Sequence, residues 1–176
     1  MKSIFDLIRE FELVEREITY KRGDILVSPG TVETNIFWIT NGTIKVSIFD
    51  EEEERIVRFG YQNNLIVALD SFLTKQPTDF LMQAIKKTEV KLIPYKKWID
   101  FLEKDSNHKH LWTLQLQQLV IQQLEREKDL LIQSPKLRLE RVLKRSPNLF
   151  QEIPKKHIAS YLRMTPETLS RLKNLD

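Results

Sequence analysis

The side chains best suited to chemistry lie near the end of the chain, in the segment IPKKHIASYLRMTPETLSRLKNLD at residues 153–176. Glu167 and Arg171 are four residues apart, so a helix would present them on one face. A carboxylate can accept a hydrogen bond from the amino group of cytosine, and a guanidinium can donate two to guanine. The pair predicts base reading in the major groove of DNA. The competing interpretation is an ion pair on a solvated helix face.

Basic residues gather in the same region. Residues 136–176 carry 10 Lys and Arg against 4 Asp and Glu, a net charge of +6, whereas residues 1–135 carry 18 against 21, a net charge of −3. A basic block at one end of a chain attracts the phosphate backbone of nucleic acids. The residues predicted to bind DNA are Thr165, Glu167, Thr168, Ser170, Arg171, Lys173, Lys155 and Lys156.

Two short helices are needed to position these side chains. Pro154 favours a helix start, and Ile158, Ala159 and Leu162 have the spacing of its inward face. Thr165 suits the N-cap of a second helix, because its hydroxyl can accept a hydrogen bond from the first turn. The pattern predicts a helix-turn-helix unit. A helical hairpin that only closes a small domain remains the alternative.

A long helix is predicted before this unit. Residues 106–133 contain neither Gly nor Pro, and their apolar residues spread over more than one face. One face can pack on the same chain, and the other needs a second copy, so we expect a homodimer. Ser134-Pro135 should end the helix and act as a hinge.

The first half of the chain has the pattern of short strands. A short helix is expected at residues 3–14, followed from Ile18 to Ile93 by apolar runs broken at Gly23, Gly30 and Gly42. Ile44, Val46 and Ile48 alternate with polar residues, which predicts a strand with one buried face. The acidic run at residues 50–54 is expected to form an exposed hairpin loop. This pattern predicts an α+β protein with an N-terminal barrel or sandwich.

Composition excludes several functions. The chain has no cysteine, so disulfides and iron–sulfur clusters are excluded. No apolar run reaches the length of a membrane span and no export signal is recognisable, so we expect a cytoplasmic protein with no membrane partner. Residues 18–93 contain no histidine to hold a catalytic metal, which argues against a cupin-like enzyme and predicts no enzymatic activity. His108, His110 and His157 are expected at the surface.

The chain resembles the Crp/Fnr superfamily of bacterial transcription regulators. The resemblance rests on KRGDILVSPG and IFWITNGTIKV, on the long helix, and on IASYLRMTPETLSRLK. It implies a double-stranded β-helix (β-roll) of the cyclic nucleotide-binding type at residues 1–105, a dimerisation helix at residues 106–134 and a helix-turn-helix domain at residues 135–176. It also implies double-stranded DNA with an inverted repeat and RNA polymerase as partners. Arg163 stands where the family usually has glycine, and little or no wing follows Arg171.

The part of the β-roll that holds the cyclic phosphate in nucleotide-binding members is degenerate here. Residues 63–84 contain no Arg, Glu or Gly, whereas a buried phosphate needs a fixed cation and a ribose hydroxyl needs an acceptor. We therefore expect cyclic AMP not to bind, and another effector or none to take its place. The alternative function is a β-roll that binds a small molecule and whose C-terminal helices mediate only protein contacts.

Overall fold

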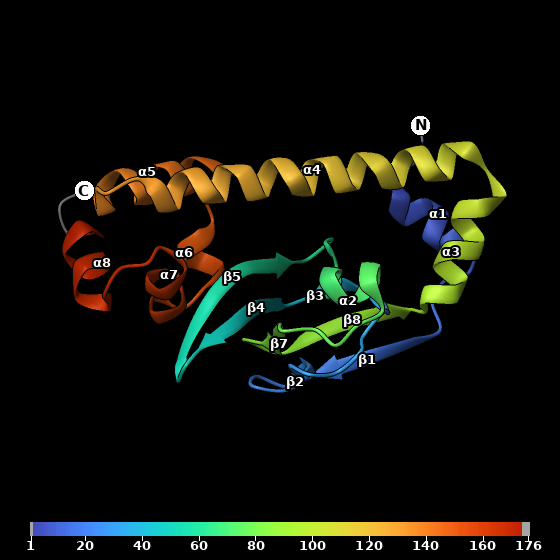
Figure 1. Ribbon diagram of the computed structural model, residues 1–176, viewed down its shortest axis with the longest axis horizontal. Coiled ribbons are helices and arrows are strands. Elements are labelled where there is room, and N and C mark those ends of the chain that lie inside the picture. The colour runs from blue at the N-terminus through green and yellow to red at the C-terminus, as the bar shows by residue number, and fades with distance from the viewer. Residues whose placement is uncertain (1, 174–176) are drawn as a thin grey trace. The chain divides into compact units, whose positions relative to one another are not determined.

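The computed structural model describes residues 2–173, which form two compact units (Figure 1). Residues 2–48 and 58–115 make up the first unit. Residues 49–57 and 116–173 make up the second. The second unit thus combines the tip of a β-hairpin with all of the C-terminal helices.

Eight strands form two four-stranded sheets, in the orders β1-β8-β3-β6 and β2-β7-β4-β5. The pairings are antiparallel, as between β1 and β8 and between β4 and β7. The predicted α+β class and N-terminal β structure are therefore confirmed. The strands are β1 (Arg16–Tyr20), β2 (Ile25–Val27), β3 (Ile36–Asn41), β4 (Thr43–Asp50), β5 (Glu53–Tyr61), β6 (Leu65–Ile66), β7 (Leu81–Ala84) and β8 (Thr88–Ile93).

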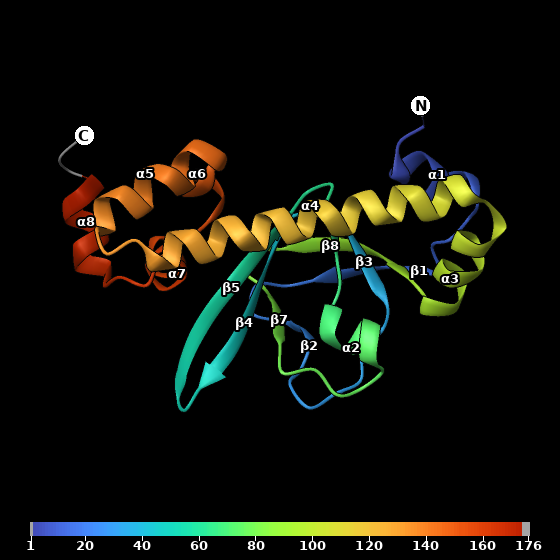
Figure 2. The same ribbon diagram turned by 45° about the horizontal axis from the view of Figure 1, so that its top comes forward.

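Helices occupy both ends of the chain. The first unit contains α1 (Ile4–Glu10), α2 (Leu69–Thr74), α3 (Tyr95–Lys104) and the start of α4 (Ser106–Leu131). The second contains the rest of α4 together with α5 (Pro135–Arg145), α6 (Leu149–Glu152), α7 (Lys155–Tyr161) and α8 (Pro166–Lys173), and Figure 2 shows these last four gathered at the C-terminal end of α4. None of the described helices is long and apolar enough to cross a membrane.

The long helix ends earlier than predicted. Helix α4 has 26 residues and stops at Leu131, two residues short of the expected end. The Ser134 hydroxyl accepts a hydrogen bond from the backbone N–H of Leu137 at 3.4 Å and so caps α5, with Pro135 at its first position. The chain therefore breaks between α4 and α5, where Ser134-Pro135 predicts a break.

Strand β4 departs from the sequence expectation. Ile44 and Val46 join the core, as predicted, but Lys45 is only 4% exposed and Ser47 is fully buried. Both residues form polar or electrostatic interactions within the protein. The strand lies between β7 and β5 in its sheet. Polar side chains can be buried when they are hydrogen-bonded, so alternation alone does not identify an exposed face.

His108 also differs from the expected surface position, being only 6% exposed. Its Nδ1–H donates to the carbonyl oxygen of Phe101 at 2.8 Å, and its ring stacks on the Phe101 ring with centroids 4.0 Å apart. The satisfied ring nitrogen and the aromatic neighbour explain how an imidazole is buried here. His110 is exposed, as predicted, and His157 is half-buried.

Candidate nucleic-acid interface

A tight turn joins α7 to α8. The backbone N–H of Arg163 donates to the carbonyl of Ser160 at 3.1 Å, and that of Met164 donates to the carbonyl of Ala159 at 3.0 Å. These two bonds close a Schellman motif, which requires a left-handed residue at Arg163, and φ there is 53°. Arg138 on α5 donates from Nη2 to the Arg163 carbonyl at 3.3 Å. The turn is therefore fixed from both sides although it lacks glycine.

Helix α8 begins as the sequence predicts. The Thr165 hydroxyl accepts a hydrogen bond from the backbone N–H of Thr168 at 3.1 Å, so Thr165 is the N-cap. Pro154 differs slightly, because it precedes α7 instead of lying in its first turn. Apolar residues of the two helices pack together, and their buried members are Ile158, Ala159, Leu162 and Leu169.

The outward side of α8 carries the predicted DNA-binding residues. Glu167, Arg171 and Lys173 are exposed, whereas Thr168 and Ser170 are half-buried. Within the described residues, no ion pair joins Glu167 to Arg171, so the competing ion-pair interpretation loses its geometric support. Lys173 Nζ lies 4.6 Å from the centroid of the Phe150 ring on α6.

Glu167 is held in its ionised form. Its pKa is lowered by hydrogen bonding to its own backbone N–H, by the Thr165 hydroxyl and by the positive charge of Arg171. A carboxylate at the first turn of a helix is also favoured by the helix dipole. Glu167 is therefore available as a hydrogen-bond acceptor at neutral pH.

Lys155 and Lys156 lie at the start of α7 and are exposed. Neither has an ion-pair partner in the described part of the chain. Both ammonium groups can therefore approach a phosphate without first breaking an internal contact.

Part of the basic block has another role. Arg141 Nε lies 2.8 Å from Asp129 Oδ1, and Arg145 also binds the Asp129 carboxylate. Arg141 Nη2 lies 2.8 Å from Glu125 Oε2. Burial alone would raise the pKa of Asp129, but the hydrogen bonds from Arg145 and Arg141 outweigh it and lower the pKa. The net charge of +6 therefore overstates the charge available to DNA.

Sequence reasoning missed two arginines that shape this region. Arg138 holds the turn, as described, and Arg126 is only 7% exposed on α4. A single arginine amid the leucine and glutamine of a long helix was the available signal for Arg126. No sequence pattern indicated what either guanidinium contacts.

Polar side chains at residues 63–84, where the resemblance places a cyclic phosphate, are engaged with one another and with the backbone. The Asp70 carboxylate accepts hydrogen bonds from the Thr78 hydroxyl at 2.8 Å and from the backbone N–H groups of Ser71 and Asp79 at 2.8 and 3.2 Å. Lys75 Nζ donates to the Phe72 carbonyl and lies 3.1 Å from the centroid of the Tyr95 ring. A carboxylate thus occupies this segment and its cation is already engaged, so the residues do not fit a bound phosphate.

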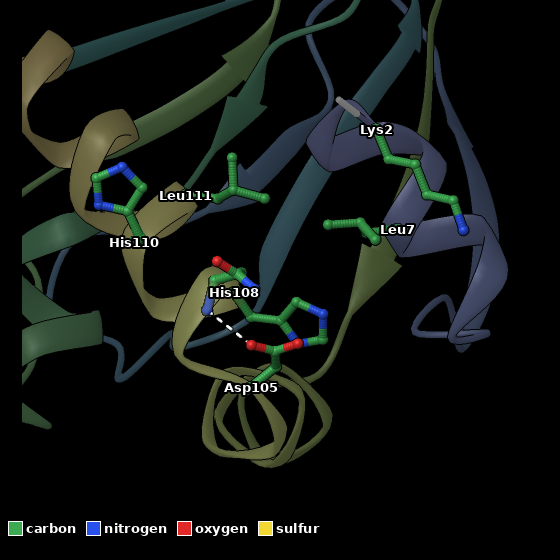
Figure 3. Close-up of a pocket in the computed structure, with 7 residues that line it drawn as sticks. Lys2, Leu7, Asp105, His108, His110 and Leu111 are labelled. Carbon is green, nitrogen blue, oxygen red and sulfur yellow. Dashed lines mark hydrogen bonds between the residues drawn. The ribbon is translucent and has the colours of Figure 1, made fainter.

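A separate pocket of about 400 Å³ lies at the start of α4 (Figure 3). Lys2 is its cationic amine, and that amine pairs with Glu10 at 2.7 Å. Asp105 adds a carboxylate, whose oxygen accepts from the backbone N–H of Asn107 at 2.8 Å. The lining residues are Lys2, Leu7, Asp105, Asn107, His108, His110 and Leu111. This mixture of charges is not a phosphate site either.

Comparisons with known proteins agree with this architecture. The sequence model of the family described as "Cyclic nucleotide-binding domain" matches residues 17–105. A CooA mutant from Carboxydothermus hydrogenoformans is similar in structure, with a TM-score of 0.76 and 17% identity over 98% of this chain and 83% of that one. FixK2 from Bradyrhizobium japonicum gives a TM-score of 0.76 and 17% identity over 93% and 84%.

A third similar structure is a CRP/FNR family transcriptional regulator from Thermus thermophilus. Its TM-score is 0.63, with 16% identity over 90% of this chain and 84% of that one. Among curated proteins, none matches the sequence. At these identities the structural likenesses establish the shared fold.

Proposed function

Because the chain belongs to the cyclic nucleotide-binding domain family and has the fold of Crp/Fnr-like regulators, we propose that it is a DNA-binding transcription regulator. In this proposal residues 1–105 form a sensor-like domain, residues 106–134 the dimerisation helix, and residues 135–176 the DNA-binding domain. The protein acts in the cytoplasm, has no catalytic activity, and affects transcription through DNA and RNA polymerase.

One observation carries the proposal: α8 is a capped helix whose exposed side holds Glu167 and Arg171 without an ion pair between them. Helices of this kind enter the major groove, and their outward side chains contact base edges. Thr165, Thr168, Ser170 and Lys173 flank these two residues. Lys155 and Lys156 on α7 supply contacts to the backbone.

The proposed protein is a homodimer. Helix α4 exposes large apolar side chains, with Val120 at 58%, Ile121 at 52%, Leu124 at 51% and Leu131 at 76%. Ile121 follows Leu114 by seven residues, and Leu131 follows Leu124 by seven, which is the repeat of a coiled-coil seam. A second copy of the same helix matches this seam, so each dimer would present two α8 helices to an inverted repeat.

The proposed β-roll does not respond to cyclic AMP. A buried cyclic phosphate needs a guanidinium, whereas Asp70 and the engaged Lys75 occupy the corresponding segment. Calorimetric titration should detect no saturable binding. A micromolar one-to-one complex would contradict this part of the proposal. In this proposal the β-roll binds an effector other than cyclic AMP, or no effector at all.

Selection from random duplexes tests DNA reading directly. We expect recovered sequences to share an inverted repeat whose half-sites are one helical turn apart, about 34 Å. Affinity for the recovered duplex should exceed that for a scrambled one by about 10³-fold or more, and both should fall steeply with salt. Equal binding to both duplexes would contradict sequence reading.

The alternative function keeps the β-roll and assigns the C-terminal helices to protein contacts. It is favoured by one observation: α7 contacts the β4–β5 hairpin through Ser160. If the chain bound neither the selected nor the scrambled duplex at low salt, this alternative function would be favoured over the regulator.

A further inference from the structure

One buried arginine on α4 contacts two other elements of the second unit. Arg126 on α4 donates from Nη2 to the Ile56 carbonyl on β5 at 3.4 Å, and its guanidinium carbon lies 3.8 Å from the centroid of the Tyr161 ring on α7. The side chain is 7% exposed. Next to it, the Ser160 hydroxyl donates to the Glu54 carbonyl at 3.2 Å. Helix α7 is thus docked on the β4–β5 hairpin.

Among the described residues, Arg126 has no carboxylate partner in this docking contact. Arg126 Nη1 is buried and has no hydrogen-bond partner among the described residues, and burial lowers the pKa of Arg126. A buried guanidinium with an unsatisfied N–H is costly, whereas the same group is fully hydrated when exposed. In contrast, the Asp129 carboxylate has two arginine partners. Release of α7 from the hairpin would rehydrate this N–H, which lowers the cost of breaking the contact.

The docked hairpin also brings negative charge to a DNA-binding helix. Residues 50–54 are all acidic, and Glu51 and Glu52 at the turn are exposed. Arg55 lies 2.6 Å from Glu53 and 3.8 Å from Asp50, so the exposed negative charge of the run is mainly that of Glu51 and Glu52. Lys156 precedes Ser160 by four residues, about 6 Å along α7 at 1.5 Å per residue. The acidic hairpin is thus docked about one helical turn from Lys156, where its exposed carboxylates oppose the approach of a phosphate group and salt screens their effect.

We propose that this contact is autoinhibitory: the β4–β5 hairpin, docked on α7 through Ser160 and Arg126, restrains the helix and lowers its affinity for the DNA backbone. Release of the hairpin raises that affinity. The inference rests on the proposed function, and it adds a mechanism by which the β-roll controls DNA binding. It concerns phosphate contacts, so it applies to any DNA sequence.

A reversible crosslink tests the contact. The chain has no cysteine, so the double variant Glu54→Cys/Ser160→Cys contains a single pair that can oxidise. The oxidised protein should bind a fluorescent mixed-sequence duplex of about 30 base pairs roughly tenfold more weakly than the reduced protein, because phosphate contacts are lost. The single variant Ser160→Cys should bind this duplex with the same affinity under oxidising and reducing conditions.

Charge neutralisation tests the electrostatic part. Glu51→Gln/Glu52→Gln should tighten binding about threefold to tenfold at low salt, and the gain should vanish near 0.5 M salt. Glu12→Gln/Glu15→Gln changes the net charge equally at exposed positions in the first unit, and Glu12 shares a positive φ with Glu51, so it is the matched control. An equal gain in the control would overturn the inference.

The two proposals fail in different ways. Equal affinity of the oxidised and reduced double variant, with normal DNA binding by the unmodified chain, would overturn autoinhibition alone. If neither the unmodified chain nor any released variant bound either the mixed-sequence or the selected duplex, the proposed regulator function would itself be wrong.

Discussion

Arg163 has a backbone conformation that glycine adopts at lower cost. Its φ of 53° is imposed by the two hydrogen bonds of the turn and by Arg138, which holds its carbonyl. For a residue with a Cβ atom, this conformation costs about 1 kcal/mol or more. Surrounding contacts therefore compensate for a strained residue between α7 and α8, as the sequence led us to expect from an arginine in place of glycine.

Arg163→Gly should stabilise the protein. Relief of strain stabilises the folded state by about 1–2 kcal/mol, and the greater freedom of glycine in the unfolded chain offsets about 0.5–1 kcal/mol of this, so we expect a net gain of up to about 1.5 kcal/mol. Urea denaturation measures it. Arg163→Val is the control, because a β-branched residue tolerates positive φ worst and should destabilise. A loss of stability in Arg163→Gly would contradict the strain argument.

Arg171 should determine sequence specificity. Its exposed guanidinium can donate to guanine O6 and N7, so Arg171→Ala should lose about 1–3 kcal/mol at one base pair while other positions keep their preference. Affinities for duplexes that carry each substitution of the selected site measure this effect.

Lys156→Ala is the matched comparison for Arg171→Ala. A phosphate contact carries no sequence information, so all duplexes should weaken alike and the salt slope should fall by about one. An unchanged specificity ratio for a folded, dimeric Arg171→Ala protein would contradict the base-reading role.

At the scale of elements, local signals predicted the long helix and the last two helices, whereas the first helix, expected at residues 3–14, spans only Ile4–Glu10 and α2 was not predicted. The two C-terminal helices and the turn between them could be read from Thr165 and from the spacing of Ile158, Leu162 and Leu169, because caps and apolar periods are local properties. Burial of Lys45 and His108 could not be read, because each depends on partners distant in the sequence or in another element. The ion pairs of Arg141 and Arg145 with Asp129 on α4 could not be predicted from the sequence for the same reason.

The junction between α4 and α5 should be acid-sensitive. Because the folded-state pKa of Asp129 is depressed, its stabilisation is complete above its unfolded pKa of about 3.9 and is lost as pH falls through the folded value. Asp129→Asn should therefore cost about 1–2 kcal/mol at pH 7 and progressively less as the pH falls below about 3.9. The expected loss of stability is small because the Arg141 and Arg145 side chains are 39% and 34% exposed, so solvent screens their attraction to Asp129.

Thermal unfolding from pH 2 to pH 7 measures the Asp129 effect. Glu127→Gln, at an exposed position on the same helix, is the control and should leave the profile unchanged. If the difference in stability between Asp129→Asn and the unmodified chain stayed constant across this pH range, the ionic origin of the Asp129 contribution would be contradicted.

At the scale of the whole molecule, charge and apolar surface are distributed unevenly along the chain. The basic excess lies in residues 136–176, and the acids that balance it lie before residue 136, including the run at residues 50–54. The exposed apolar side chains of the long helix lie from Val120 to Leu131. Binding to an inverted repeat needs both the basic residues and the apolar surface of α4. Two basic units that each bind DNA weakly bind more tightly when pairing of their α4 helices holds them together.

The homodimer is the prediction on which two-site DNA reading depends. Light scattering after size exclusion should report twice 21.0 kDa for the unmodified chain. Ile121→Glu/Leu124→Glu puts two carboxylates into the apolar seam and should yield a folded monomer. Gln122→Glu/Gln123→Glu adds the same charge at exposed neighbours outside the seam and should remain dimeric.

DNA binding then separates dimerisation from folding. The monomeric variant keeps α7 and α8 intact, so it should bind a single half-site as the unmodified chain does. On the complete inverted repeat it should lose about 10²-fold or more, because the second half-site no longer binds at high effective concentration. If the unmodified chain were a monomer at tens of micromolar, or if the Glu variant kept full affinity for the inverted repeat, the seam on α4 would have another partner and the two-site proposal would be wrong.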